Sequence, residues 1–199
     1  MKNNNLKSDI IIIRATILSA AVALVFALSS CQNKKAEDSK EVATEHNEAK
    51  FDSANEEDAK FLVAAAEINL EEIELGKLAQ QNGALADVKS LGKMMEDDHT
   101  KALKDLQALA SSKQITIPTV ITDKGLDAVK KLKDKTGNDF DKDFCQMMVK
   151  GHKDAIDKFE KESKDAANGD IRAWATSMVP SLRTHLDHAM TCQEKCEKM

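Results

Sequence analysis

Apolar residues recur at three- and four-residue steps along four long stretches of the chain, and this spacing predicts four amphipathic helices. The first stretch runs from about residue 56 to the Asn82-Gly83 stop signal, and the second covers residues 86–112. The third begins near residue 139, and the fourth follows the turn at residues 168–170. The stripes can supply one shared core, whose members include Phe61, Ile68, Leu75, Leu91, Met95, Leu106, Phe140, Phe144, Met148, Phe159, Ile171, Trp174 and Leu182.

The stretch between the second and third long helices has a different character. Residues 115–122 are rich in β-branched side chains and contain Pro118, a combination that favours extended backbone. Residues 123–135 return to helical spacing and predict one short helix. A connection of this length would let the third long helix run parallel to the second. We therefore expect an all-α domain over residues 56–197, a ferritin-like four-helix bundle with a long crossover between helices two and three.

The N-terminal residues have the pattern of an export signal. Basic residues precede a nearly uncharged run at residues 15–28, which is shorter than the roughly 20 apolar residues of a spanning helix. Leu28-Ser29-Ser30-Cys31 follows at once and resembles a bacterial lipobox, whose cysteine becomes the lipid-modified first residue. We predict a lipoprotein signal peptide over residues 1–30 and membrane attachment through a lipid on Cys31. The alternative is an uncleaved anchor; both interpretations place the domain in the cell envelope, on the outer-membrane or periplasmic side.

Charge bears on the organisation and on the partners of the chain. Residues 31–55 carry many charges and few apolar side chains, and such a segment cannot offset the entropy cost of ordering, so we predict a disordered tether. Over the whole chain, charged residues make up 32% and the formal charge is −5, with both signs interspersed. This balance disfavours nucleic acid as a partner, because phosphate attracts basic surfaces. No protein partner is indicated.

Each apolar stripe is interrupted by an ionisable residue. The interruptions are Glu72 in the first helix, Asp98-His99 in the second, His152 in the third and His185 in the fourth. A buried ionisable group is costly unless it is paired or bound to a metal, so four interruptions suggest one shared explanation. His152 and His185 lie at nearly equal distances from the turn near residue 168, and antiparallel helices would bring them level. We therefore expect one cluster inside the bundle.

This cluster is a candidate metal site. Imidazole nitrogens and carboxylate oxygens together suit Zn, Fe or Mn, and the candidate ligands are Glu72, Asp98, His99, His152 and His185. Three histidines and one carboxylate could hold a single ion if the imidazoles converge within roughly 5 Å. The alternative is a hydrogen-bonded core network that fixes helix register in a non-catalytic structural or interaction domain.

A di-iron oxidoreductase such as a ferroxidase is the least favoured interpretation. A ferritin-like di-iron site takes one Glu from each of two helices and a Glu-x-x-His pair from each of the others. Glu72 and Glu96-x-x-His99 match the first half of this pattern. In the second half, His152 stands where the pattern requires a Glu. Leu182 lies three residues before His185, where the Glu of a Glu-x-x-His pair should be. We therefore assign no catalytic residue and lean toward a protein that is not an enzyme.

Three cysteines remain beyond Cys31. Cys145 and Cys192 lie at mirrored distances from the turn between the last two helices, and an envelope compartment permits disulfides. We predict a Cys145–Cys192 disulfide, which leaves Cys196 unassigned. The rival interpretation takes His188, Cys192 and Cys196, at four-residue steps, as a soft Cu(I) or Zn site.

Several of these segments resemble the pattern of a known family. They are Glu72-Ile73-Glu74-Leu75-Gly76-Lys77-Leu78-Ala79, Met95 with Asp98-His99, Asp139-Phe140-Asp141 with His152, and Pro180-Ser181-Leu182-Arg183-Thr184-His185-Leu186. Together they resemble the DUF4142 family of bacterial envelope proteins over about residues 56–192. The resemblance implies a ferritin-like helical fold, export, often a lipid anchor, and no settled activity. It also implies that the family's polar positions are Glu72, Asp98, His99, His152 and His185, whereas Glu96 and the three late cysteines depart from the pattern.

Overall fold

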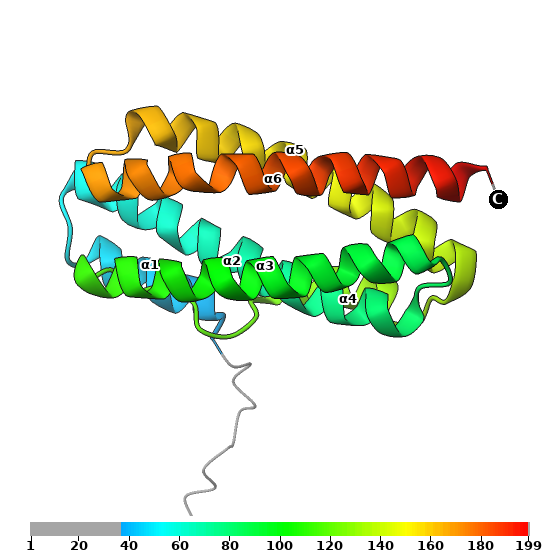
Figure 1. Cartoon of the computed structure of the whole chain (residues 1–199). Coiled ribbons are helices and arrows are strands. Elements are labelled where there is room, and N and C mark those ends of the chain that lie inside the picture. The colour runs from blue at the N-terminus through cyan, green and yellow to red at the C-terminus, as the bar shows by residue number, and fades with distance from the viewer. Residues whose placement is uncertain (1–36, 199) are drawn as a thin grey trace, which may run out of the picture. The chain divides into compact units, whose positions relative to one another are not determined.

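The computed structural model describes residues 37–198, and the regular structure in that range is entirely helical (Figure 1). Four of its helices correspond to the four predicted stripes, and a shorter one corresponds to the helix predicted after the extended segment. No strand occurs within residues 37–198, so the all-α prediction is confirmed. The six helices of this range are α1 (Ser39–Glu48), α2 (Ser53–Asn82), α3 (Ala86–Ser112), α4 (Asp123–Leu132), α5 (Gly137–Asp165) and α6 (Gly169–Glu197).

The long helices pack as two hairpins, α2 against α3 and α5 against α6 (Figure 1). Each hairpin has a connection of only a few residues, which makes its two helices antiparallel neighbours. Contacts of α3 with α6 and of α2 with α5 join the hairpins, and α4 packs on α2. This packing is consistent with the predicted helical bundle.

Two glycines let α2 and α3 approach closely. A Cβ on Gly76 would lie 2.5 Å from the carbonyl oxygen of Gly92, and a Cβ on Gly92 would lie 2.7 Å from the carbonyl oxygen of Gly76. Backbone atoms cannot move aside as a flexible side chain can, so glycine is required at both points. Asn69 and His99 lie equally far along the chain from this crossing. The crossing therefore sets these two side chains at a common height in the hairpin.

Two buried aspartates fasten the turn of each hairpin to the other hairpin. Asp58 on α2 accepts hydrogen bonds from the backbone N–H groups of residues 167–168, at 2.8 and 2.7 Å. Asp141 on α5 accepts from the backbone N–H groups of residues 84–85, at 2.9 and 2.8 Å. Each carboxylate thus uses both of its oxygens in charge-assisted bonds. The two anchors hold the hairpins together at the two ends of the bundle.

The predicted tether over residues 31–55 is wrong for residues 39–48, which form α1, and for residues 53–55, which begin α2. Asn47 is buried and exchanges two hydrogen bonds with the backbone of Thr116, in the crossover segment that lacks helix and strand. Its Nδ2 donates to the Thr116 carbonyl at 2.7 Å, and the Thr116 N–H donates to its Oδ1 at 2.9 Å. This pairing orders a segment that has little apolar surface, a contact that composition alone cannot reveal.

The export prediction falls on residues 1–30 and Cys31, which lie outside the described residues. Helices α2 to α6 cover the predicted domain over residues 56–197. Among residues 37–198, none of the helices combines the length and the apolar character needed to cross a membrane.

A layer of polar residues divides the buried core into two apolar clusters. One cluster is built around Phe61 and Phe159, and the other is built around Met95, Phe140 and Phe144. Each long helix passes from one cluster to the other through buried polar residues. They are Asn69 and Glu72 on α2, His99 on α3, His152 on α5 and His185 on α6.

Candidate metal centre

Three buried histidines meet in this polar layer. His99 comes from α3, His152 from α5 and His185 from α6, and one ring nitrogen of each lies within 4.8 Å of the other two. The three residues are 2%, 1% and 2% exposed. Their ring centroids are separated by 5.8, 5.3 and 5.3 Å. The three imidazoles therefore converge on one point of the layer, and the three histidines could bind a metal.

In two of the histidines, an amide or carbonyl oxygen holds the ring nitrogen that points away from the other two rings. His99 Nδ1 lies 3.0 Å from Asn69 Oδ1, and the Asn69 amide nitrogen donates to the Ala65 carbonyl at 2.7 Å. The amide oxygen of Asn69 is therefore the atom that faces His99. His152 Nδ1 lies 2.9 Å from the carbonyl oxygen of Met148. Since both partners accept, each Nδ1 donates its proton, and the lone pair of each neutral ring lies on Nε2.

A carboxylate orients the third histidine. His185 Nε2 lies 2.9 Å from Asp98 Oδ2 and 3.2 Å from Ser181 Oγ. Donation from Nε2 to the carboxylate leaves the lone pair of the neutral ring on Nδ1. His185 Nδ1 lies 3.3 Å from His152 Nε2, so two lone pairs face each other. The separation matches the ~3.4 Å between two nitrogen ligands that tetrahedral Zn–N bonds of ~2.0–2.1 Å produce.

The remaining inner nitrogen is His99 Nε2. It is buried and has no hydrogen-bond partner in the described part of the chain. Leaving such a group unpaired costs about 1–3 kcal/mol. The three rings thus direct one free nitrogen inward, while Asn69, Met148 and Asp98 hold the outer ones. Metal-binding histidines have this arrangement, because the outer hydrogen bond fixes the tautomer and the direction of the ring.

Burial keeps the three rings neutral at neutral pH. It lowers the pKa of His99 well below the ordinary value, and the neighbouring His152 and His185 lower that pKa further. It lowers the pKa of His152 to about 4. It also lowers the pKa of His185, against the opposing effect of the Asp98 carboxylate. Neutral imidazoles can bind a cation without first losing a proton.

The predicted carboxylate ligands lie outside the group of converging atoms. Asp98 has a half-exposed side chain on the outer nitrogen of His185, so it orients a candidate ligand and does not join the inner group as predicted. Glu72 is only 6% exposed, and its Oε2 lacks a partner among the described residues. Burial raises the pKa of Glu72 to about 8, so its neutral form predominates at neutral pH. Glu96 accepts from Gln80 at 2.7 Å, outside the cluster.

Asn69 is the residue of this site that the sequence reasoning missed. It is buried on the inner stripe of α2, between Ala65 and Glu72. An amide on an apolar stripe is the same signal as a histidine there, because a buried amide also needs partners. A search for uncharged polar interruptions would have found it.

The three late cysteines lie in the apolar cluster around Phe140, and all are free thiols. Cys145 Sγ lies 3.8 Å from Cys196 Sγ, and a hydrogen bond with Cys192 raises the pKa of Cys145. The predicted Cys145–Cys192 disulfide is not formed in this structure and stays a prediction for oxidising conditions. The rival soft-metal set, His188, Cys192 and Cys196, does not converge. Within residues 37–198, His99, His152 and His185 form the only group of three or more such residues whose ligand atoms lie within 4.8 Å of one another, and His188 is exposed.

Comparison with known proteins adds a family to this geometry. A family model described as a domain of unknown function, DUF4142, matches residues 42–192. No curated protein and no solved structure matches the chain. The matched range holds the three histidines together with Asn69, Met148 and Asp98. The chain therefore belongs to the DUF4142 family, as the sequence resemblance predicted.

Proposed function

We propose that this domain binds one divalent transition metal ion through His99, His152 and His185. The observation that carries the proposal is the inward direction of three lone pairs whose rings are already fixed from outside. A hydrogen bond between His152 Nε2 and His185 Nδ1 would need a proton that neither atom carries in these tautomers. A cation would satisfy both atoms and the unpaired His99 Nε2 together.

Zn, Fe and Mn are the metals that this donor set suits. Three imidazoles leave at least one coordination position open, and Glu72 is a buried carboxyl group of the same layer with an unpaired oxygen. We propose Glu72 as the carboxylate that completes the site. Two hairpins joined by a long crossover support a ferritin-like arrangement, a fold in which inward side chains build metal sites. The role is sequestration or protection from metal stress, without a catalysed reaction.

We further propose that the domain works in the cell envelope as a lipoprotein attached to a membrane through Cys31. The support is the uncharged run at residues 15–28 followed directly by Leu28-Ser29-Ser30-Cys31. Membrane fractionation of the Cys31→Ser variant tests it. Retention of that variant in the membrane fraction, at the level of the unmodified chain, would refute the lipid anchor.

A structural role for the cluster is the second candidate. The Asn69–His99 bond joins α2 to α3, and the Asp98–His185 bond joins α3 to α6, so the cluster could serve to lock helix register. In that case the His99→Ala variant would lose a few kcal/mol of stability, as expected when a buried partner is left unpaired, and there would be no metal to lose.

Metal content distinguishes the two candidates. The full chain is purified without chelators, and bound metal is measured by elemental analysis before and after incubation with Zn(II), Fe(II) or Mn(II). We expect one equivalent of one of these metals and a rise in the unfolding temperature, because a ligand at 100-fold its Kd stabilises by about 2.7 kcal/mol.

Two variants on α6 provide the matched comparison. His185→Gln should lose the metal, whereas His188→Gln, on the exposed side of the same helix, should keep it. No bound metal and no thermal shift in the unmodified chain would leave the structural role as the explanation. Equal metal content in the two variants would exclude His185 as a ligand.

A further inference from the structure

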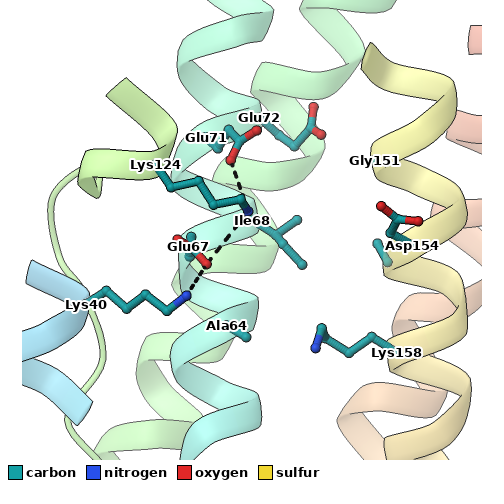
Figure 2. A pocket seen from close by; sticks show the side chains of 11 residues that line it. Lys40, Ala64, Glu67, Ile68, Glu71, Glu72, Lys124, Gly151, Asp154 and Lys158 are labelled. Atoms are coloured by element: carbon teal, nitrogen blue, oxygen red, sulfur yellow. Dashed lines mark hydrogen bonds and ion pairs between the residues drawn. The ribbon is translucent and has the colours of Figure 1, made fainter. Parts of the chain in front are cut away.

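A cavity of about 300 Å³ lies between α2 and α5, close to the polar layer (Figure 2). Its walls combine apolar, acidic and basic side chains, and one glycine leaves part of a wall without a side chain. The lining residues that matter here are Ile68, Glu72, Gly151, Asp154, Ala155 and Lys158.

Each of the two helices that form the cavity also carries a residue of the polar layer on a neighbouring face: Asn69 on α2 and His152 on α5. On α2, Ile68 and Glu72 line the cavity one position before and three positions after Asn69, which holds His99. On α5, Gly151 and Ala155 stand in the same relation to His152. At 3.6 residues per turn, these positions lie on one side of the site residue, roughly 60–100° around each helix. The cavity therefore adjoins the cluster along two helices.

Glu72 and Gly151 face each other at this junction. Glu72 extends from α2 toward α5, and a Cβ on Gly151 would lie 3.5 Å from Glu72 Oε1 (Figure 2). The other oxygen of Glu72, Oε2, is buried and lacks a partner among residues 37–198. A carboxyl group that is nine-tenths buried, lines a cavity and has an unpaired oxygen is suited to receive a cation.

On the opposite side of the cluster, between α3 and α6, the ring of His185 is already held by hydrogen bonds. There, Asp98 and Ser181 both lie within hydrogen-bond distance of His185 Nε2. A cation that arrived between α3 and α6 would have to displace this carboxylate, which fixes the tautomer of His185. Between α2 and α5, a cavity already leads to an unpaired carboxyl group.

The charged residues that line the cavity differ in whether they have an ion-pair partner. Glu67 is paired with Lys40 at 2.8 Å, and Lys124 lies 3.6 Å from Glu71, on the side of α2 away from α5 (Figure 2). Lys158 reaches from α5 toward α2 across the cavity (Figure 2). Its positive charge opposes the passage of a cation, and that opposition can be measured.

We propose that the cavity between α2 and α5 is the port through which a divalent cation moves between solvent and the three histidines. The proposal rests on the metal function proposed above. Glu72 is the residue that receives the ion at the inner end, and Gly151 leaves the space that the ion crosses beside His152.

The experiment is stopped-flow binding of Co(II), whose visible absorption reports nitrogen coordination, to the metal-free full chain. Gly151→Leu fills the junction beside Glu72, so association and dissociation of Co(II) should both slow. Lys158→Gln removes an opposing charge and should speed association about two- to fivefold at low ionic strength. Lys153→Gln is the matched control, because this exposed lysine lies on the same helix and does not line the cavity.

The outcomes separate the port from the metal site itself. Normal Co(II) binding with unchanged rates in both Gly151→Leu and Lys158→Gln would overturn the port and leave the site intact. Equal acceleration by Lys158→Gln and Lys153→Gln would also overturn it, since the effect would then be one of net charge. Absence of any Co(II) absorption in the unmodified chain would overturn the site, and the port with it.

Discussion

The buried polar groups at the ends of the bundle differ from those in its middle. At the ends, Asp58 and Asp141 each accept two backbone hydrogen bonds, and both oxygens of both carboxylates are used. In the middle, Glu72 Oε2 and His99 Nε2 have no partner in the described chain, and His152 and His185 point lone pairs at each other. The same fold thus pairs its structural carboxylates completely and leaves inward acceptors where four helices converge. Incomplete pairing of buried acceptor atoms, more than burial, marks the site.

The largest expected effect comes from breaking an end anchor. Asp141→Ala would leave two buried backbone N–H groups without their charged acceptor, so we expect the free energy of unfolding to fall by about 3–5 kcal/mol. Urea denaturation measures it, with Asp157→Ala, an exposed position on the same helix, as the control expected to stay within about 0.5 kcal/mol. A loss of unfolding free energy no larger than that of the control would show that the α2–α3 turn does not depend on Asp141.

Replacing Glu72, in the middle of the bundle, should stabilise the protein, whereas replacing Asp141 should destabilise it. The folded-state pKa of about 8 lies above the ordinary 4.5, so the folded chain binds more protons between these values and the free energy of unfolding falls as pH rises from 4.5 to 8. Glu72→Gln removes this titration. The variant should therefore gain on the order of 3 kcal/mol relative to the unmodified chain between pH 5 and pH 8.

Urea denaturation of both metal-free chains at these two pH values gives the measurement. A difference between the chains that does not change with pH would mean that Glu72 is solvated in the folded protein. Glu72 would then not belong to the unpaired buried groups in the middle of the bundle.

A smaller effect with the opposite sign is expected from His152. Its folded-state pKa of about 4 lies below the ordinary 6.5, so the unfolded chain binds more protons in this interval. The free energy of unfolding should fall as pH drops from 6.5 to 4, by about 2 kcal/mol from this residue. His152→Asn should remove that part of the acid loss, and His188→Asn, at an exposed position, should leave it unchanged. Identical acid profiles for the two variants would contradict the burial of a neutral His152.

Much of the fold could be predicted because each long helix has a regular apolar stripe. The three histidines could be found for the same reason, since each interrupts a stripe and lands in one layer. The role of Asp98 could not, because neighbours on a helix differ by about 100° in direction, and only packing shows that Asp98 reaches His185 from the side.

Other features depend on contacts between distant parts of the chain. Helix α1 is ordered through Asn47 and the crossover backbone, although its own composition predicts disorder. Helix spacing predicted Cys192 as the neighbour of Cys145, and the structure also brings Cys196 Sγ within 3.8 Å of Cys145 Sγ. Sequence periodicity does not determine such pairings, because it specifies faces and not neighbours.

Because of the Gly76–Gly92 crossing, mutations at two distant glycines would disturb the layer of buried histidines. Neither glycine touches a histidine, yet a side chain at either one would push α2 away from α3 and shift Asn69 relative to His99. If the domain binds a metal as proposed, a screen for loss of metal binding would therefore return these glycines together with the three histidines. The heritable information for the site extends beyond the residues that would contact an ion, to two positions that contribute no side chain.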